Sequence, residues 1–124
     1  MITPNQYRQA LELIAIEYAK AKRKLSSYGA AHLLFIRLDH TYDEAFKVAN
    51  SLLSQRYAMD FSRATKRYVA LGTPADVAEK LSEFYSNGVR HFEFDFLGTP
   101  EERLHQANLF SDEVRPLLDF PCKS

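Results

Sequence analysis

Charged side chains gather at the ends of two segments that we expect to be strands. Arg37, Asp39 and His40 close the first segment, and Asp95 lies at the end of the second. In proteins built on parallel strands, catalytic groups come from the C-terminal strand ends and the loops that follow. These four residues are therefore the catalytic candidates, and Arg37 or His40 can face a cofactor or an anionic substrate. The simpler interpretation is that Arg37 pairs with Asp39 and that His40 is solvated near a helix start.

The second segment also carries an ionisable residue at every other position. His91, Glu93 and Asp95 share one face of a strand, because side chains alternate between the two faces. Such a row is costly in a dry interior unless its members are paired. We therefore expect this face to be wet, or covered by a partner with polar groups. An acid/base pair formed by Glu93 and Asp95 is the alternative interpretation.

Other chemistry finds little support in the residue types. The four histidines, His32, His40, His91 and His105, have no metal-ligand spacing with Cys, Asp or Glu, so no metal site is expected. No serine lies in a Gly-x-Ser-x-Gly turn, which excludes that class of hydrolase. Cys122 is the only cysteine, and its place near the end of the chain does not favour a nucleophilic role.

Composition indicates one ordinary globular domain spanning residues 1–124. The chain is 46% hydrophobic and 26% charged, and 16 basic residues balance 16 acidic ones. The zero net charge gives no reason to expect a nucleic acid or membrane partner, and the basic cluster at residues 20–24 is explained by the end of a helix. No apolar run approaches the roughly 20 residues of a membrane span. The start of the chain lacks signal-peptide character, and a single cysteine rules out an intrachain disulfide, so a reducing cytoplasm is expected.

Gly, Pro and capping residues divide the chain into alternating helices and strands. Thr3, Thr41, Thr73 and Thr99 each precede an acidic or amide residue three positions later, as in a helix capping box. Apolar spacing then predicts helices over residues 4–25, 42–57, 59–68, 74–86 and 100–116, and strands over 31–38 and 89–96. The run from Leu33 to Ile36 predicts burial on both faces. The fold class is therefore α/β, with two parallel strands and helices mainly on one side.

An ordered series of segments resembles a known family. The stretch 70–97 contains Gly-Thr-Pro-Ala-Asp-Val-Ala-Glu-Lys-Leu and a Ser-Asn-Gly-Val turn into a strand. Residues 34–39 with 43–45, residues 56–61, and residues 101–118 extend the series in both directions. Together they resemble the C-terminal part of the luciferase-like flavin-dependent monooxygenases.

The resemblance implies part of a (β/α)8 barrel that binds reduced FMN or coenzyme F420 at the C-terminal ends of its strands. A complete barrel needs roughly 200 residues or more, so this chain corresponds to the last two βα units only. No Gly-rich loop that cradles a phosphate is present, because all four glycines are expected in turns or helix stops. The resemblance therefore does not carry catalysis over to this chain.

Two unpaired sheet edges invite association. We expect a homodimer with twofold symmetry, or a higher homo-oligomer. Three functions stay open: the C-terminal part of a flavin-dependent oxidoreductase, a stand-alone non-catalytic homo-oligomer, and one half of a split barrel that another chain completes. The start at Met1 before a well-capped helix suits a complete short reading frame.

Overall fold

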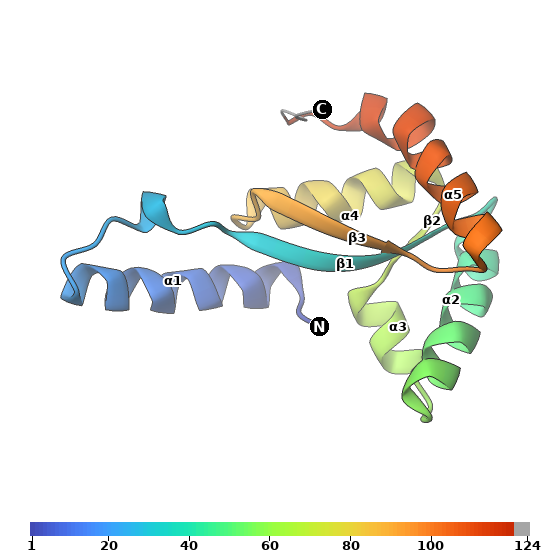
Figure 1. The fold of residues 1–124 in the computed structure, drawn as a ribbon, viewed down its shortest axis with the longest axis horizontal. Coiled ribbons are helices and arrows are strands. Elements are labelled where there is room, and N and C mark those ends of the chain that lie inside the picture. Colours follow the sequence, from blue (N-terminus) through green and yellow to red (C-terminus); the bar gives the residue numbers. More distant parts are fainter. Residues whose placement is uncertain (121–124) are drawn as a thin grey trace.

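The fold alternates helices with short parallel strands (Figure 1). The computed structural model describes residues 1–120, apart from the side chain of Ser27, and Cys122 lies outside them. The elements in chain order are α1 (Pro4–Lys20), η1 (Leu25–Ser27), β1 (Ala31–Leu38), α2 (Tyr42–Tyr57), α3 (Ser62–Tyr68), β2 (Ala70–Gly72), α4 (Pro74–Ser86), β3 (His91–Phe96), α5 (Pro100–Leu109), η2 (Phe110–Val114) and η3 (Arg115–Leu117).

The sheet has three parallel strands in the order β2-β1-β3, so the prediction of two strands is wrong. The strand missed is β2, whose three residues are too short to show a period and lie between two helices. All three are buried, and Ile36 to Leu38 of β1 pair with them. β1 is therefore the central strand, and β3 pairs with it along Ala31 to Ile36.

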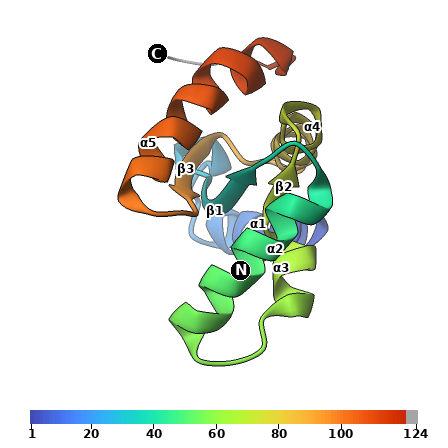
Figure 2. The ribbon, with the colours of Figure 1, turned by 90° about the vertical axis from the view of Figure 1, so that its right-hand side faces the viewer.

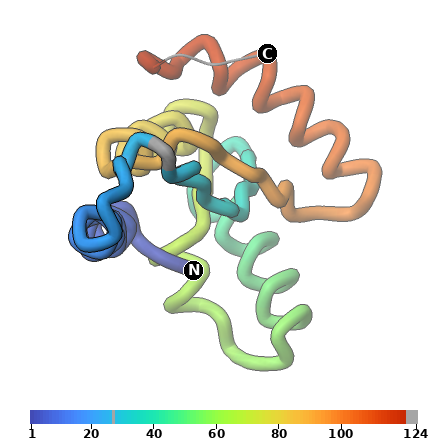
Figure 3. The backbone as a smooth tube through the Cα atoms, turned by 60° about the vertical axis from the view of Figure 1, so that its left-hand side comes forward, coloured from blue at the N-terminus to red at the C-terminus, as the bar shows by residue number. Residues whose placement is uncertain are grey.

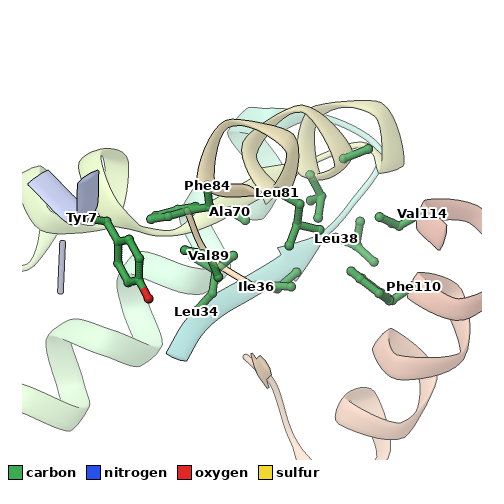
Figure 4. Packing of buried hydrophobic residues seen from close by; sticks show 12 residues of the cluster. Tyr7, Leu34, Ile36, Leu38, Ala70, Leu81, Phe84, Val89, Phe110 and Val114 are labelled. Carbon is green, nitrogen blue, oxygen red and sulfur yellow. The ribbon is translucent and has the colours of Figure 1, made fainter. Parts of the chain in front are cut away.

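One face of the sheet, here named the α4 face, holds the larger apolar core. Leu34, Ile36 and Leu38 of β1 point to this face and pack against Leu81 and Phe84 of α4. Phe110 and Val114, from the C-terminal helical segment, close the same cluster at its far end (Figure 4). The alternation of β1 thus places every second residue in this core.

The opposite face, here named the α2 face, is covered over only part of its length. Phe35 packs with Ala45, Ala49 and Leu53 of α2 in a second apolar cluster. Figure 2 shows α2 and α3 below the sheet, with α4 and α5 above it, so helices lie on both sides and not mainly on one. Leu33, toward the start of β1, is 53% exposed, which corrects its predicted burial.

The first helix is shorter and less buried than its pattern indicates. α1 ends at Lys20, and Lys22 then adopts a left-handed backbone, so the predicted continuation to residue 25 is wrong. Only Tyr7 is buried, and its hydroxyl donates to the carbonyl of Ala31. Leu11 contacts Gly88 after α4, while the rest of the helix projects beyond the sheet (Figure 1). Figure 3, which looks nearly along α1, shows this helix on the side of the molecule away from α5.

The C-terminal helical segment changes its winding along its length. α5 passes through a π-helical turn in η2 and a 3₁₀ turn in η3, where Pro116 lies. The π turn brings Phe110 and Val114 into the core. No helix within residues 1–120 is long and apolar enough to cross a membrane.

Candidate functional site

The candidate residues at the strand ends centre on Arg37. Its side chain is only 10% exposed, and its Nε donates to Asp39 Oδ2 at 3.3 Å. Its Nη1 donates to the carbonyl of Leu97 at 3.0 Å and to Glu102 Oε2 at 2.7 Å. The ion pair expected between Arg37 and Asp39 is therefore present, and a second carboxylate completes it. The charge of Arg37 is balanced by two carboxylates and its side chain is only 10% exposed, so it has little attraction for an external anion.

Glu102 connects this ion pair to the start of α5. Its Oε1 accepts from the N–H of Thr99, while the Thr99 hydroxyl accepts from the N–H of Glu102, which forms a capping box. The hydrogen bond from Arg37, aided by that from the Thr99 N–H, lowers the pKa of the Glu102 carboxyl. Sequence reasoning identified Glu102 as a cap only. No signal within the sequence distinguishes its bond to a residue 65 positions away.

Asp95 lies on the α2 face, between two arginines from different helices. Its Oδ2 accepts from Arg56 Nη1 at 3.2 Å, and Arg103 Nη2 is 3.5 Å from its Oδ1. Oδ1 is buried without a hydrogen bond, so Arg103 acts on it as an ion pair only. The Arg56 guanidinium also lies 5.7 Å from the centre of the Phe35 ring. Neither arginine was singled out by sequence reasoning.

The other members of the predicted polar row face solvent. His91 and Glu93 are exposed, in agreement with a wet face toward the start of β3. His40 is exposed after β1, and its backbone N–H donates to Asp39 Oδ1. The structure thus brings Arg37 and Asp39 together, while Asp95 belongs to a separate arginine cluster and, within residues 1–120, the His40 side chain forms no hydrogen bond or ion pair.

A buried glutamine continues the sheet where β3 ends. Gln106 of α5 accepts from the N–H of Leu38 through Oε1 at 2.7 Å. Its Nε2 donates to the carbonyl of the same residue at 2.8 Å. Gln106 is 4% exposed, so the side-chain amide replaces a strand partner in a dry place. Sequence reasoning missed this residue, because a glutamine within an ordinary helix pattern is expected to face solvent.

The loops before α4 and α5 are filled by their own carboxylates. A Cβ placed on Gly72 would collide with the Asp76 carboxylate, and one on Gly98 would lie 2.8 Å from Glu102 Cβ and 3.0 Å from Arg37 Nη1. In an anion-binding loop, backbone N–H groups and the helix N-terminus point at the ligand. Here side-chain carboxylates take that position, so these residues do not fit a phosphate group.

A hollow lies away from the strand ends, between α4, β3 and the C-terminal segment. This cleft has a volume of about 620 Å³ and is lined mainly by apolar and aromatic side chains. Its lining includes Phe92 and Phe94 on β3, Leu81 and Tyr85 on α4, and Phe120. Within residues 1–120, no group of three or more His, Cys, Asp and Glu side chains is arranged to hold a metal ion.

Comparison with known proteins gives matches in structure and none in sequence. No family model matches the chain, and no curated protein matches it. The coenzyme F420-dependent tetrahydromethanopterin reductase of Methanopyrus kandleri is similar with a TM-score of 0.66 and 18% identity. An F420-dependent secondary alcohol dehydrogenase, solved with an F420-acetone adduct, is similar with a TM-score of 0.75 and 14% identity.

These matches concern the fold and only part of the known enzymes. They cover 94% and 95% of this chain, but 43% of the reductase and 41% of the dehydrogenase. The chain therefore spans less than half the length of each. Both enzymes are members of the luciferase-like family, so the resemblance read from the sequence is confirmed at the level of the fold.

Proposed function

We propose that this chain supplies closing strands of a luciferase-like barrel and has no oxidoreductase activity by itself. The observation that carries the proposal is the state of the strand ends. The charge of Arg37 is balanced by the Asp39 and Glu102 carboxylates, and the glycine loops are filled by cap carboxylates. FMN and coenzyme F420, the cofactors that the family resemblance implies, both carry phosphate, and these loops do not fit phosphate. A complete cofactor site would need strands that lie outside this chain.

Titration with each cofactor tests the proposal directly. The chain is added to FMN and, separately, to coenzyme F420, and quenching of cofactor fluorescence is followed. We expect no saturable quenching at micromolar protein, because the cation at the strand ends is already paired. Saturable binding of either cofactor by the chain alone would contradict the proposal.

We further propose that the chain associates with a second copy of itself. Three large apolar side chains, Leu13, Ile16 and Leu33, are 66%, 53% and 53% exposed on α1 and on the uncovered part of the α2 face. Leu13 and Ile16 are three positions apart and therefore neighbours on the surface of α1, and exposed apolar surface of this kind marks association sites. The zero net charge removes electrostatic repulsion between copies. A twofold dimer would shelter this surface, whereas a complementary barrel chain is the alternative partner.

Light scattering coupled to size exclusion separates these partners. A dimer is expected at micromolar concentration, and Leu13→Glu should shift it to a monomer. Leu104→Glu is the matched control, because Leu104 on α5 is 68% exposed and lies away from α1. A monomeric parent chain would contradict self-association and favour the split-barrel alternative.

A further inference from the structure

The cleft beside β3 has features of a ligand site that the strand ends lack. Its volume of about 620 Å³ falls within the range of about 300–1,000 Å³ typical of small-molecule sites. The strand ends occupy the carboxyl edge of the sheet, whereas this cleft opens between α4, the exposed edge of β3 and the C-terminal segment. A ligand bound here would therefore be independent of the cofactor chemistry considered above.

Aromatic rings form the walls of the cleft. Phe92 stacks on Phe94 with ring centres 5.8 Å apart, and Phe94 contacts Phe110 at 4.7 Å. On the other side, Tyr85 stacks on Phe120 at 4.3 Å. Phe120 also stacks against Phe92, with ring centres 6.4 Å apart, so the two walls meet there. Phe92 and Phe94 are only partly buried, so part of their surface remains open to a flat or extended apolar body.

The ionisable groups of the lining are basic, apart from the Tyr85 hydroxyl. Arg90 and Arg115 line the cleft, as does His91, whose side chain belongs to the opposite face of β3, and no Asp or Glu is among the described lining residues. This bias is local, because the whole chain has equal numbers of acidic and basic residues. Within residues 1–120, neither Arg90 nor Arg115 forms an ion pair. The cleft therefore carries uncompensated positive charge beside an apolar wall.

Arg90 is also held in place without a carboxylate. Its Nη1 donates to the carbonyl of Tyr85 at 2.7 Å and to that of Val89 at 2.9 Å. Its guanidinium lies 4.1 Å from the centre of the Tyr85 ring. A cation positioned by two carbonyls and a ring keeps further N–H groups for an anionic acceptor.

We propose that this cleft binds a small anionic amphiphile. Its apolar body, flat or extended, lies against Phe92 and Phe94, and a single carboxylate or sulfonate is held by Arg90, Arg115 or both. The charge complementarity of the lining selects an anion over a neutral molecule of the same shape. The apolar walls select an amphiphile over a small inorganic anion.

Two fluorescent probes of similar shape and different charge provide the test. 1-Anilinonaphthalene-8-sulfonate is anionic, and N-phenyl-1-naphthylamine is its neutral counterpart. We expect saturable binding of the sulfonate at one site per chain, tighter than that of the amine, and displacement by decanoate. Equal affinity for both probes, or binding at many weak sites, would overturn the proposal.

Charge and shape variants then assign the site to the cleft. Arg115→Gln and Arg90→Gln should each weaken sulfonate binding by about two- to fivefold, as expected for one partly exposed ion pair. Lys47→Gln on α2 is the charge control and should leave binding unchanged. Leu118→Glu places an acid in the lining and should abolish binding. Leu117→Glu changes the neighbouring residue, which is 53% exposed and does not line the cleft, and should not.

Two controls exclude other causes of a change in sulfonate binding. Near-ultraviolet circular dichroism of each variant must match that of the parent, because partly folded chains also bind the sulfonate. Light scattering is recorded on the same samples. Sulfonate binding that appears only when an oligomer dissociates would mean that a second copy covers the cleft, and would overturn the proposal. Arginine variants that bind like Lys47→Gln would do the same.

Discussion

The same five-residue helix-capping motif occurs twice in this chain, and its acidic residue makes different contacts in the two places. Gly72–Asp76 leads into α4 and Gly98–Glu102 leads into α5, and in both the threonine and the acidic residue cap the helix reciprocally. The Asp76 carboxylate accepts a hydrogen bond from the N–H of Thr73 and, within residues 1–120, forms no ion pair. Glu102 has one more methylene, and its second oxygen reaches Arg37. A local cap thereby becomes a link between distant parts of the chain.

The helices that follow the two loops depend on different forces. α4 buries Val77, Ala78, Leu81 and Phe84, so apolar packing attaches it to the sheet. α5 buries only Gln106 before the π turn, and its attachment to β1 passes through that amide and Glu102. The first unit should therefore tolerate polar substitutions near its cap, and the second should not.

Replacement of the Arg37 side chain should cause the largest loss of unfolding free energy among the variants that compare the two loops. Arg37→Met leaves the Leu97 carbonyl and the Asp39 and Glu102 carboxylates without their partner. We expect the free energy of unfolding to fall by about 3 kcal/mol, measured by urea denaturation. Arg63→Met, at an exposed position on α3, is the control. An equal response of the two variants would show that the Arg37 contacts do not stabilise the fold.

Gln106→Glu tests the second connection of α5. The carboxylate can still accept from the Leu38 N–H, but it cannot donate to the Leu38 carbonyl, and it places a charge in a buried position. A loss of about 2 kcal/mol is expected in the same urea experiment. Asn108→Asp makes the same chemical change at an exposed site two residues away and should be nearly neutral. A stable Gln106→Glu protein would refute the role given to the amide.

Exchange of the two acidic caps sharpens the comparison. Glu102→Asp keeps a capping carboxylate but shortens its reach to Arg37, and should cost about 1 kcal/mol of unfolding free energy. Asp76→Glu lengthens the other cap, which has no arginine to reach, and should cost less. Thermal unfolding of the pair, recorded side by side, checks this order. The reverse order would mean that the difference between the loops lies outside the caps.

The smallest expected difference between the two loops is in the pH dependence of the free energy of unfolding. The hydrogen bond from Arg37 lowers the pKa of Glu102 below its ordinary value of 4.5. A depressed carboxyl pKa stabilises the folded state above the unfolded pKa, and this contribution is lost as pH falls through the folded pKa. Glu102→Gln should therefore flatten the dependence of unfolding free energy on pH below about 4.5. Urea titrations at several acidic pH values measure it, and parallel curves for parent and variant would contradict the assignment.

Local signals in the sequence predicted most elements and few of their connections. The threonine caps and the span of β1 agree with the structure, because they depend on neighbours within four residues. β2 was missed because it is too short to show a pattern. The pairing of Arg37 with Asp39 is local and was anticipated. The bonds to Glu102, and from Gln106 to Leu38, join residues more than 60 positions apart, which no periodicity reveals.

The alternation of charged and aromatic residues along β3 has a consequence for aggregation of the protein. Among the described residues β3 pairs only with β1, so its outer edge is free to template another strand. Its sequence, His-Phe-Glu-Phe-Asp-Phe, would suit a stacked fibril if its charges were silenced. Glu93 and Asp95 interrupt the aromatic residues of this segment, as gatekeeper residues do on an exposed edge strand.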